Sequence, residues 1–510
     1  MLHRLRNYML YPLIALATGI MLLMAVGVAY EDEVKARLIT AVNAHLNAPV
    51  SVQDIDLTLI RRFPNASLHL HNVLVQEAYP GSTLADTLLH AQDLYLEFAL
   101  FDLFGGSYTI DHIHADRVVA YPRHNADGLA NYTIWGSDST AETTAIDLRM
   151  ISFEDLFLRY RHEGNVLDLK FHAQSLALSG SFSGSLNTLH AAGDVELLDW
   201  SQHGSSLLAQ RRTEVDLHMD LGAGDAPFRI TNGEVKADGM SLTTTLSVSP
   251  DDRGTHIDLR AAGDRIELET LFAQLPRSLT DPLKRYGMAG ESDVVIHYSG
   301  TIGEGLRPTL QVDLALRAAR FSEQGSGTTF KGVHGWLEAT INGQGDLEKL
   351  VIRELKASTG SGSLKADLEL RAGSKGSIKG GLKADLAFGD LLRFAQIDTL
   401  EQAEGRLRAD LKFDGPFSEP GRYGVREMRQ LRLSGTATLD KAAIKMKGIR
   451  HRVTDLHAEL VLNGADVRLV GMHADVQGSR IALEGSLRNL VPYVLVEQER
   501  LEIEAAASSD

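Results

Sequence analysis

Hydrophobic and polar residues alternate with a period of two along most of the chain. The stretch S-L-K-A-D-L-E-L at residues 363–370 alternates leucine or alanine with charged side chains. Successive side chains of a β-strand point to opposite faces, so this pattern predicts a strand with one apolar and one polar face. The same alternation occurs at residues 215–221, 242–248, 310–316 and 407–413. The chain is therefore predicted to be mainly β.

A few segments depart from this alternation. Residues 31–47 carry apolar side chains four apart, which predicts an amphipathic helix. Residues 98–106 predict a short helix that ends at two glycines. Further helical segments are predicted within residues 270–286, 390–400 and 423–431. Residues 136–145 are mostly polar and predict a linker.

Two long parts of the chain resemble each other. W-L-E-A-T-I-N-G-Q-G-D-L-E-K-L-V-I, from residue 336, is similar to L-H-A-E-L-V-L-N-G-A-D-V-R-L-V, from residue 456. G-D-R-I-E-L-E-T-L-F, from residue 263, is similar to G-D-L-L-R-F-A, from residue 389. These matches predict two units of many strands, at 263–388 and 389–510, after an earlier β segment at 146–262.

A sheet with one apolar face must bury that face against something. The predicted helices are too few to cover so many strands. A second sheet could pack on the first, as in a sandwich or a closed barrel. Alternatively, one long sheet could curl into a groove whose apolar interior is filled by something other than protein. Periodicity leaves both possibilities open.

The N-terminus predicts a membrane anchor. Residues 7–30 contain no charged side chain, and ~20 apolar residues suffice to cross a bilayer. Arg4 and Arg6 precede this run and acidic residues follow it, which places residues 1–8 in the cytoplasm and 9–30 in the membrane. A cleaved signal peptide is the alternative, although its apolar core usually spans only ~7–15 residues. In either case the rest of the chain lies outside the cytoplasm.

Composition and motifs argue against most kinds of chemistry. The formal net charge of −16 argues against a nucleic-acid partner, which needs a basic surface. The absence of cysteine excludes disulfides and thiol nucleophiles. The chain contains no P-loop, no H-E-x-x-H and no G-x-S-x-G motif. We therefore expect no enzymatic activity and no cofactor.

Two His-x-His pairs need separate treatment. His69 and His71, like His112 and His114, flank one apolar residue, so each pair lies on one face of a strand. Metal sites use this spacing. The apolar residue between them places the histidines on the polar face, and no further ligand pattern in the sequence completes either set. We interpret them as solvated histidines and expect no metal.

Residues 31–135 resemble the N-terminal module of AsmA-like proteins of Gram-negative bacteria. The resemblance rests on the anchor, the amphipathic helix and N-A-P-V-S-V-Q-D-I-D-L-T-L-I-R-R-F-P-N-A-S-L-H-L-H-N-V-L-V. It continues through F-D-L-F-G-G-S-Y-T-I-D-H-I-H-A-D-R-V-V to D-G-L-A-N-Y-T-I-W. Later segments such as A-E-G-R-L-R-A-D-L-K-F-D-G-P also resemble the β-rich body of the family.

The family is similar in architecture to bridge-like lipid transfer proteins. The resemblance implies an elongated, curled antiparallel β-sheet with an apolar interior, a β-groove, after the transmembrane helix. It implies an inner-membrane anchor, a periplasmic body and phospholipids as cargo. The predicted lining of the groove comprises Leu57, Leu59, Leu68, Leu70, Leu94, Leu96, Leu217, Met219, Leu246, Leu310, Val312, Leu314, Leu316, Leu364, Leu368, Leu370, Leu407, Leu411, Phe413, Leu469, Ile481 and Leu483.

These expectations combine into non-enzymatic transfer of glycerophospholipid from the inner toward the outer membrane. The alternatives are an assembly or scaffold factor for outer-membrane proteins and a periplasmic enzyme acting on envelope lipid or glycan. The sequence ends within an alternating run, L-E-I-E-A-A-A-S-S-D. This ending predicts either an open end of the groove or a longer protein, with an envelope partner at the C-terminal end.

Overall fold

The computed structural model describes most of the chain from residue 48 onward. The described residues are 48–58, 65–78, 86–99, 110–127, 129–132, 149–164, 166–180, 186–202, 205–208, 211–222, 227–274, 286–303, 305–323, 328–374, 376–395, 400–417, 430–448, 450–464, 466–490 and 500–509. The predicted cytoplasmic segment, anchor and N-terminal helix, residues 1–47, lie outside them. So do the linker 136–145 and most of the predicted helices 98–106 and 423–431. Among the described residues, no helix has the length and apolar character needed to span a membrane.

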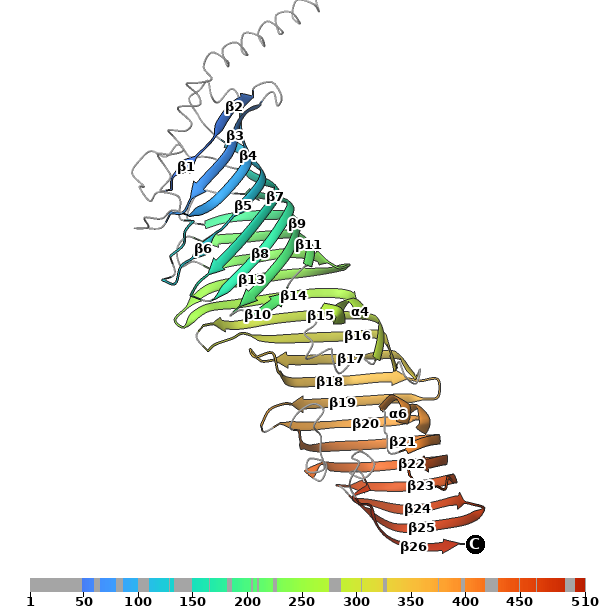
Figure 1. The fold of residues 1–510 in the computed structure, drawn as a ribbon. Coiled ribbons are helices and arrows are strands. Elements are labelled where there is room, and N and C mark those ends of the chain that lie inside the picture. The colour runs from blue at the N-terminus through green and yellow to red at the C-terminus, as the bar shows by residue number, and fades with distance from the viewer. Residues whose placement is uncertain are drawn as a thin grey trace, which may run out of the picture. The chain divides into compact units, whose positions relative to one another are not determined.

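The described chain is mainly β, as its alternating pattern predicts, and it divides into two compact units. The first unit comprises Met1–Asp238 and Thr243–His256, and the second comprises Gly239–Leu242 and Ile257–Asp510. Figure 1 labels most of the strands and the two α-helices of the described part.

The first unit consists of strands in the described residues. They are β1 (Val50–Ser51), β2 (Asp54–Thr58), β3 (Asn65–Gln76), β4 (Thr87–Ala99), β5 (Ile110–Ala120), β6 (Arg123–His124), β7 (Met150–His162), β8 (Leu167–Gly180), β9 (Leu186–Gln202), β10 (Ser205–Leu208), β11 (Arg211–Gly222), β12 (Phe228–Ala237) and most of β13 (Met240–Asp251). Consecutive long strands pair antiparallel, from β3 with β4 to β11 with β12.

One step in this unit departs from the predicted antiparallel order. β5 pairs parallel with β7, and the short β6 also pairs parallel with β7. Two parallel neighbours cannot be joined by a tight hairpin, so the chain needs a longer connection to return to the start of the next strand. Residues 121–149 form this connection. The sheet is therefore mixed, and the prediction of a purely antiparallel sheet was wrong at this step.

The second unit continues with long antiparallel strands and contains both described helices. Its elements are β14 (Gly254–Glu267, in this unit from Ile257), α4 (Leu268–Gln274), β15 (Tyr286–Ile302), β16 (Thr309–Glu323), β17 (Thr329–Ile341), β18 (Leu347–Ser358), β19 (Ser363–Arg371), β20 (Ser377–Ala387), α6 (Phe388–Ala395), β21 (Leu400–Pro416), β22 (Arg432–Met446), β23 (Val453–Asn463), β24 (Asp466–Val476), β25 (Ser479–Arg488) and β26 (Glu502–Ser509).

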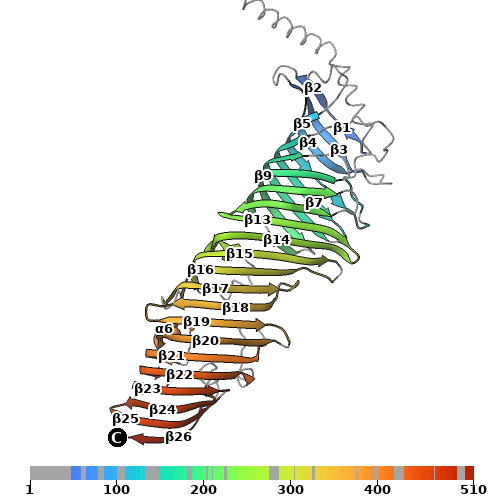
Figure 2. The same ribbon diagram turned by 180° about the vertical axis from the view of Figure 1, so that it is seen from behind.

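The strands β15 to β26 pair in sequence order, each with the next. Figure 2 shows these strands from behind, lying side by side in that order. Within each unit, the extensive contacts between described strands join neighbours in the sheet and do not join two facing sheets. The described strands therefore form open sheets, so neither a sandwich nor a closed barrel is present in them.

The two helices occupy equivalent places. Each follows a strand directly, α4 after β14 and α6 after β20, and each precedes a strand of 17 residues. α4 buries Leu268 and Leu271 against the apolar side chains of β15–β17. α6 contacts β20 and β21 and lies beside the ends of these strands in both views (Figure 1, Figure 2).

Bulges recur in the same order in two successive blocks of strands. The pairing shifts at β15–β16, β16–β17, β17–β18 and β18–β19, and again at β21–β22, β22–β23, β23–β24 and β24–β25. Between these groups, β19–β20 and β20–β21 pair without interruption. Gly290 lies at the bulge of β15–β16 and Gly405 at the second bulge of β21–β22, and both have positive φ. The two similar segments found in the sequence lie on β17–β18 and on β23–β24.

A buried polar network fixes the connection after β5. Asn131 is fully buried, and its amide nitrogen donates to the Glu77 carboxylate at 2.9 Å and to the Tyr121 carbonyl at 3.0 Å. Its side-chain oxygen accepts from the Arg123 backbone N–H at 2.8 Å, and the Arg123 guanidinium contacts Glu77 at 2.7 Å. One side chain therefore ties the end of β3 to the segment that leads from β5 to β7.

Replacing this side chain should loosen the first unit. Asn131→Ala leaves buried hydrogen-bonding groups of Glu77, Tyr121 and Arg123 without this partner, which costs ~2 kcal/mol of unfolding free energy. The free energy of unfolding is measured in urea, with hydrogen exchange of peptides from the first unit as the readout. Asn125→Ala, which removes a turn contact to the Leu129 N–H, is the control and should cost less than ~1 kcal/mol. Equal losses in the two variants would contradict the assignment.

Candidate functional site

The candidate site is the apolar face of the sheet, defined here as the face that carries the alternating hydrophobic side chains. In the second unit, cross-strand register joins these positions into unbroken rows. One row runs through Val294, Leu314, Leu337, Ile352, Leu368, Gly380, Phe413 and Leu433. A second row runs through Leu386, Leu407, Leu439, Ala458, Met472, Leu483 and Ala507. Together the rows extend from β15 to β26 without a polar side chain.

The first unit has an equivalent row. It runs through Leu68, Leu96, Ile113, Ile151, Leu178, Ala191, Leu217 and Gly233. The parallel step between β5 and β7 does not interrupt it, because Ile113 and Ile151 are in register. Directly opposed residues of paired strands share a face, so these positions form one apolar surface across β3–β12.

The predicted lining residues divide into two groups by their exposure. Those that the described structure buries are Leu68, Leu70, Leu96, Val312, Leu314, Leu316, Leu370 and Leu469. Those that stay half-buried are Leu94, Leu217, Met219, Leu246, Leu310, Leu364, Leu368, Leu407, Leu411, Phe413, Ile481 and Leu483. Leu57 pairs in register with Leu68, but its side chain and all of Leu59 lie outside the described part.

The helix α4 accounts for part of this burial. Leu316 is buried in the same cluster as Leu268 of α4, and Leu314 packs in the cluster of Leu271. Leu368 lies on β19, where the described residues leave it half-buried between Ile352 and Gly380 of the neighbouring strands. The helix α4 thus covers one part of the apolar face, while Leu68, Leu70, Leu96 and Leu469 are buried in clusters that contain no residue of a described helix.

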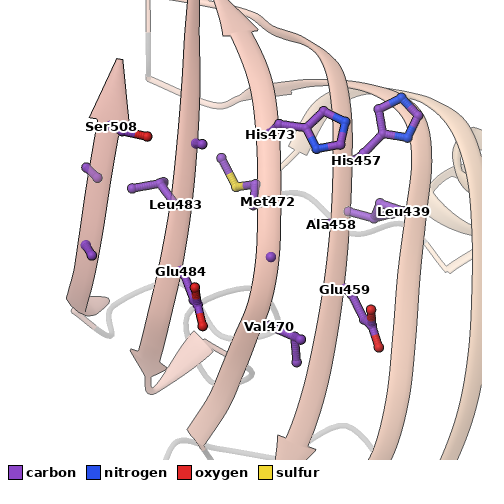
Figure 3. Close-up of a pocket in the computed structure, with 14 residues that line it drawn as sticks. Leu439, His457, Ala458, Glu459, Val470, Met472, His473, Leu483, Glu484 and Ser508 are labelled. Carbon is purple, nitrogen blue, oxygen red and sulfur yellow. The ribbon is translucent and has the colours of Figure 1, made fainter. Parts of the chain in front are cut away.

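An open hollow of about 700 Å³ lies over β22–β26. Figure 3 shows Met472 and Leu483 in its middle, with the imidazoles of His457 and His473 toward one end of the strands. The carboxylate of Glu484 lies toward the other end. Met472 and Leu483 belong to the apolar row. His457, His473 and Glu484 each follow or precede a residue of that row along their strands, so their side chains leave the opposite face of the sheet.

The opposite face of the sheet is charged. Arg159 contacts Asp168 at 2.6 Å, and this hydrogen bond lowers the pKa of the Asp168 carboxyl below its usual value. On β20 and β21, Arg406 contacts Asp385 at 2.5 Å and lowers the pKa of that carboxyl in the same way. These carboxylates are ionised at neutral pH, so this polar face favours water and does not suit apolar molecules.

The histidine pairs lie on this polar face, as their spacing predicts. His112 and His114 both contact the Ser152 hydroxyl, at 2.7 and 2.8 Å. His69 and His71 lie beside Asp56 and Asp93, which come from neighbouring strands. The sequence shows no ligand pattern that completes this pair, because these carboxylates reach it through cross-strand register and not through local spacing.

Sequence reasoning also missed the glycines of the apolar face. A Cβ on Gly380 would lie 2.7 Å from the Phe413 ring and 2.3 Å from the Asp367 carbonyl oxygen. The ring of Phe413 therefore occupies the space that a side chain at Gly380 would need. The signal was present in the sequence, since Gly380 falls in the apolar phase of its strand.

Adjacent glycines provide a matched test of this packing. Gly380→Ala forces Phe413 and the backbone of β19 to move, and overpacking of this kind costs ~1–3 kcal/mol. A Cβ on Gly381 meets nothing closer than 3.6 Å, so Gly381→Ala should change stability by less than ~0.5 kcal/mol. Urea unfolding monitored in the second unit compares the two variants. A loss at Gly381 equal to that at Gly380 would contradict the placement of Phe413.

Comparisons with known proteins add no identification. No family model, no curated protein and no solved structure matches the chain. The functional assignment therefore rests on the residues and geometry of this chain.

Proposed function

We propose that the chain is an AsmA-like protein that transfers glycerophospholipid along its apolar face, without catalysis, from the inner toward the outer membrane. The observation that carries this proposal is the unbroken apolar row across successive strands, much of it half-buried in the described residues. An enzyme needs a localised set of reactive groups, whereas a lipid path needs an apolar surface that continues from one end to the other.

Physical chemistry supports acyl chains as the occupants of this face. Removing one CH₂ group from water contributes ~0.8 kcal/mol, so a long acyl chain gains much by lying on half-buried leucines. Rows such as Leu382–Leu411 and Leu407–Leu439 repeat similar side chains at each strand. A lipid would therefore meet nearly the same surface at each step, which favours sliding over tight binding at one position.

The recurring bulges support a curled sheet. A bulge bends its strand and increases the local twist, and bulges aligned on neighbouring strands bend the sheet along a line. Gly290, opposite Ala319, and Gly405, opposite Ala442, approach the next strand so closely that a Cβ would lie within 3 Å of its backbone. We propose that this curvature turns the apolar face into the wall of a groove.

The proposal includes the membrane context. Residues 9–30 would anchor the chain in the inner membrane and place the β-rich body in the periplasm. The phospholipids of that membrane would be the cargo, and an envelope partner at the C-terminal end would receive them. The net charge of −16 disfavours docking of the whole body on anionic lipid heads, so lipid would enter through the apolar face.

A charge on the apolar face should interrupt lipid occupancy. Leu368→Asp places a carboxylate in the middle of a row, and burying it beside acyl chains is unfavourable. We expect fewer phospholipids to co-purify with the full-length chain, as counted by mass spectrometry after extraction. Lys365→Asp introduces the same carboxylate on the exposed side of the same strand and should leave the lipid count unchanged.

The same variants test transfer in cells whose outer-membrane phospholipid supply depends on this chain. Leu368→Asp should slow the movement of pulse-labelled phospholipid to the outer membrane, and Lys365→Asp should not. If several charged variants of the apolar face transfer lipid normally, the lipid path is not on this face. A stable protein that carries no lipid and retains an outer-membrane assembly component would favour the scaffold function instead.

A further inference from the structure

Four titratable side chains converge on the polar face of β2, β3 and β4. His71 Nε2 lies 3.2 Å from Asp56 Oδ2, and His71 Nδ1 lies 3.2 Å from Asp93 Oδ1. His69 Nε2 lies 2.8 Å from the same Asp93 oxygen. One potential ligand atom from each of Asp56, His69 and His71 lies within 4.8 Å of the others. These distances place three donors around a common point.

The backbone fixes this arrangement. His69 and His71 are two residues apart on β3, so their side chains leave the same face of the strand. Asp56 of β2 is in register with His69, and Asp93 of β4 is in register with His71. Tyr95 stacks on His69 with ring centroids 4.1 Å apart, which further restricts that imidazole. Three paired strands thus fix the backbone positions from which the donors extend.

Asp93 acts differently from Asp56. Its Oδ1 contacts one ring nitrogen of each histidine, and its other oxygen receives the Arg117 guanidinium at 2.6 Å. A carboxylate that accepts a hydrogen bond from one imidazole nitrogen leaves the second nitrogen of that ring as a lone-pair donor. Metal-binding histidines commonly have such a carboxylate partner, which orients the ring and raises its basicity. Asp93 therefore prepares both rings to bind a cation.

We propose that Asp56, His69 and His71 bind a divalent transition metal ion of the zinc class, with Asp93 as the carboxylate that orients both histidines. Two imidazoles and one carboxylate are a donor set that zinc accepts. Calcium and magnesium prefer oxygen ligands throughout, so the histidines disfavour them. Three protein ligands leave a fourth position for water or for a further donor.

A second His–Asp group on the same kind of face is a weaker candidate. His190 and His218 stack with centroids 4.7 Å apart, and His190 contacts Asp216 at 2.8 Å. Exposure does not separate the two groups, because His71 and Asp56 are 32% and 59% exposed, against 37% and 56% for His190 and Asp216. The first group differs by Asp93, whose side chain is only 13% exposed and contacts both of its histidines. This second group therefore provides the internal control.

Metal at the first group would fasten β2 to the sheet. In the described residues, β2 is hydrogen-bonded along one edge only, to β3. A ligand that binds only the folded arrangement stabilises it in proportion to the logarithm of its concentration over Kd. We therefore expect zinc to protect β2 and β3 from hydrogen exchange, with no effect on the strands of the second unit.

The test uses the full-length chain, purified in detergent and stripped with a chelator, and zinc chloride alone as the probe. Isothermal titration should show one step tighter than any other. His71→Ala should weaken this step at least tenfold, and Asp93→Asn should weaken it ~10-fold or more, as loss of an orienting carboxylate does. His218→Ala should leave it unchanged. Circular dichroism verifies that each variant is folded. If His71→Ala does not fold, Asp93→Asn alone tests the contribution of the first group to zinc binding.

Three results would overturn the proposal. The first is a wild-type chain without a zinc step tighter than that of the His71→Ala variant. The second is loss of the tight step in His218→Ala with retention in His71→Ala, which would place the site at the second group. The third is zinc binding that leaves hydrogen exchange of β2 and β3 unchanged. Cobalt used in place of zinc gives an independent measurement, because imidazole ligation alters the intensity of the visible spectrum of the bound ion. His71→Ala should abolish this change in intensity.

Discussion

The structure depends on how an apolar sheet face is kept from water when few of the described elements cover it. A leucine on this face packs against the residues two positions away on its own strand and against its partners on the neighbouring strands. Such contacts bury Leu314 and Leu316 beside α4, but they leave Leu368 and Phe413 half-buried in the described residues. Each exposed apolar Å² costs ~25 cal/mol, so this surface favours any apolar molecule that can lie along it. An exposed apolar surface is unfavourable in an isolated sheet, and in this chain it is the basis of the proposed lipid path.

The two faces of the sheet differ in their side chains. Ion pairs such as Arg159–Asp168 keep one face hydrated. The rows of the other face contain only hydrocarbon side chains, methionine and glycine, so they offer no fixed polar partner to a passing lipid. Regular strands without bulges, β19 and β20, separate the two blocks of bulged strands. This alternation of bent and regular strands gives each block the same local geometry and would extend one groove by repetition.

Periodicity predicted the strands well where one face is apolar. Residues 363–370 lie within β19, and the helix predicted within 390–400 corresponds to α6 at Phe388–Ala395. Periodicity could not decide between an open sheet and a sandwich, because both bury the same alternating positions. It also missed the parallel pairing of β5 with β7, which depends on a long connection and not on either strand. The contacts of Asp56 and Asp93 with His69 and His71 were equally hidden, since cross-strand register joins residues that are distant in sequence.

The proposed lipid path is tested most directly by site-specific photo-crosslinking along β19 in living cells. A photoreactive amino acid would replace each residue from 364 to 370 in turn, and crosslinked phospholipid would be detected on the purified chain. Lipid transfer along the apolar face predicts crosslinks at Leu364, Ala366, Leu368 and Leu370 and none at Lys365, Asp367 and Glu369. Crosslinking that ignores this period of two, or that is absent at all seven positions, would contradict the assignment of the apolar face as the lipid path.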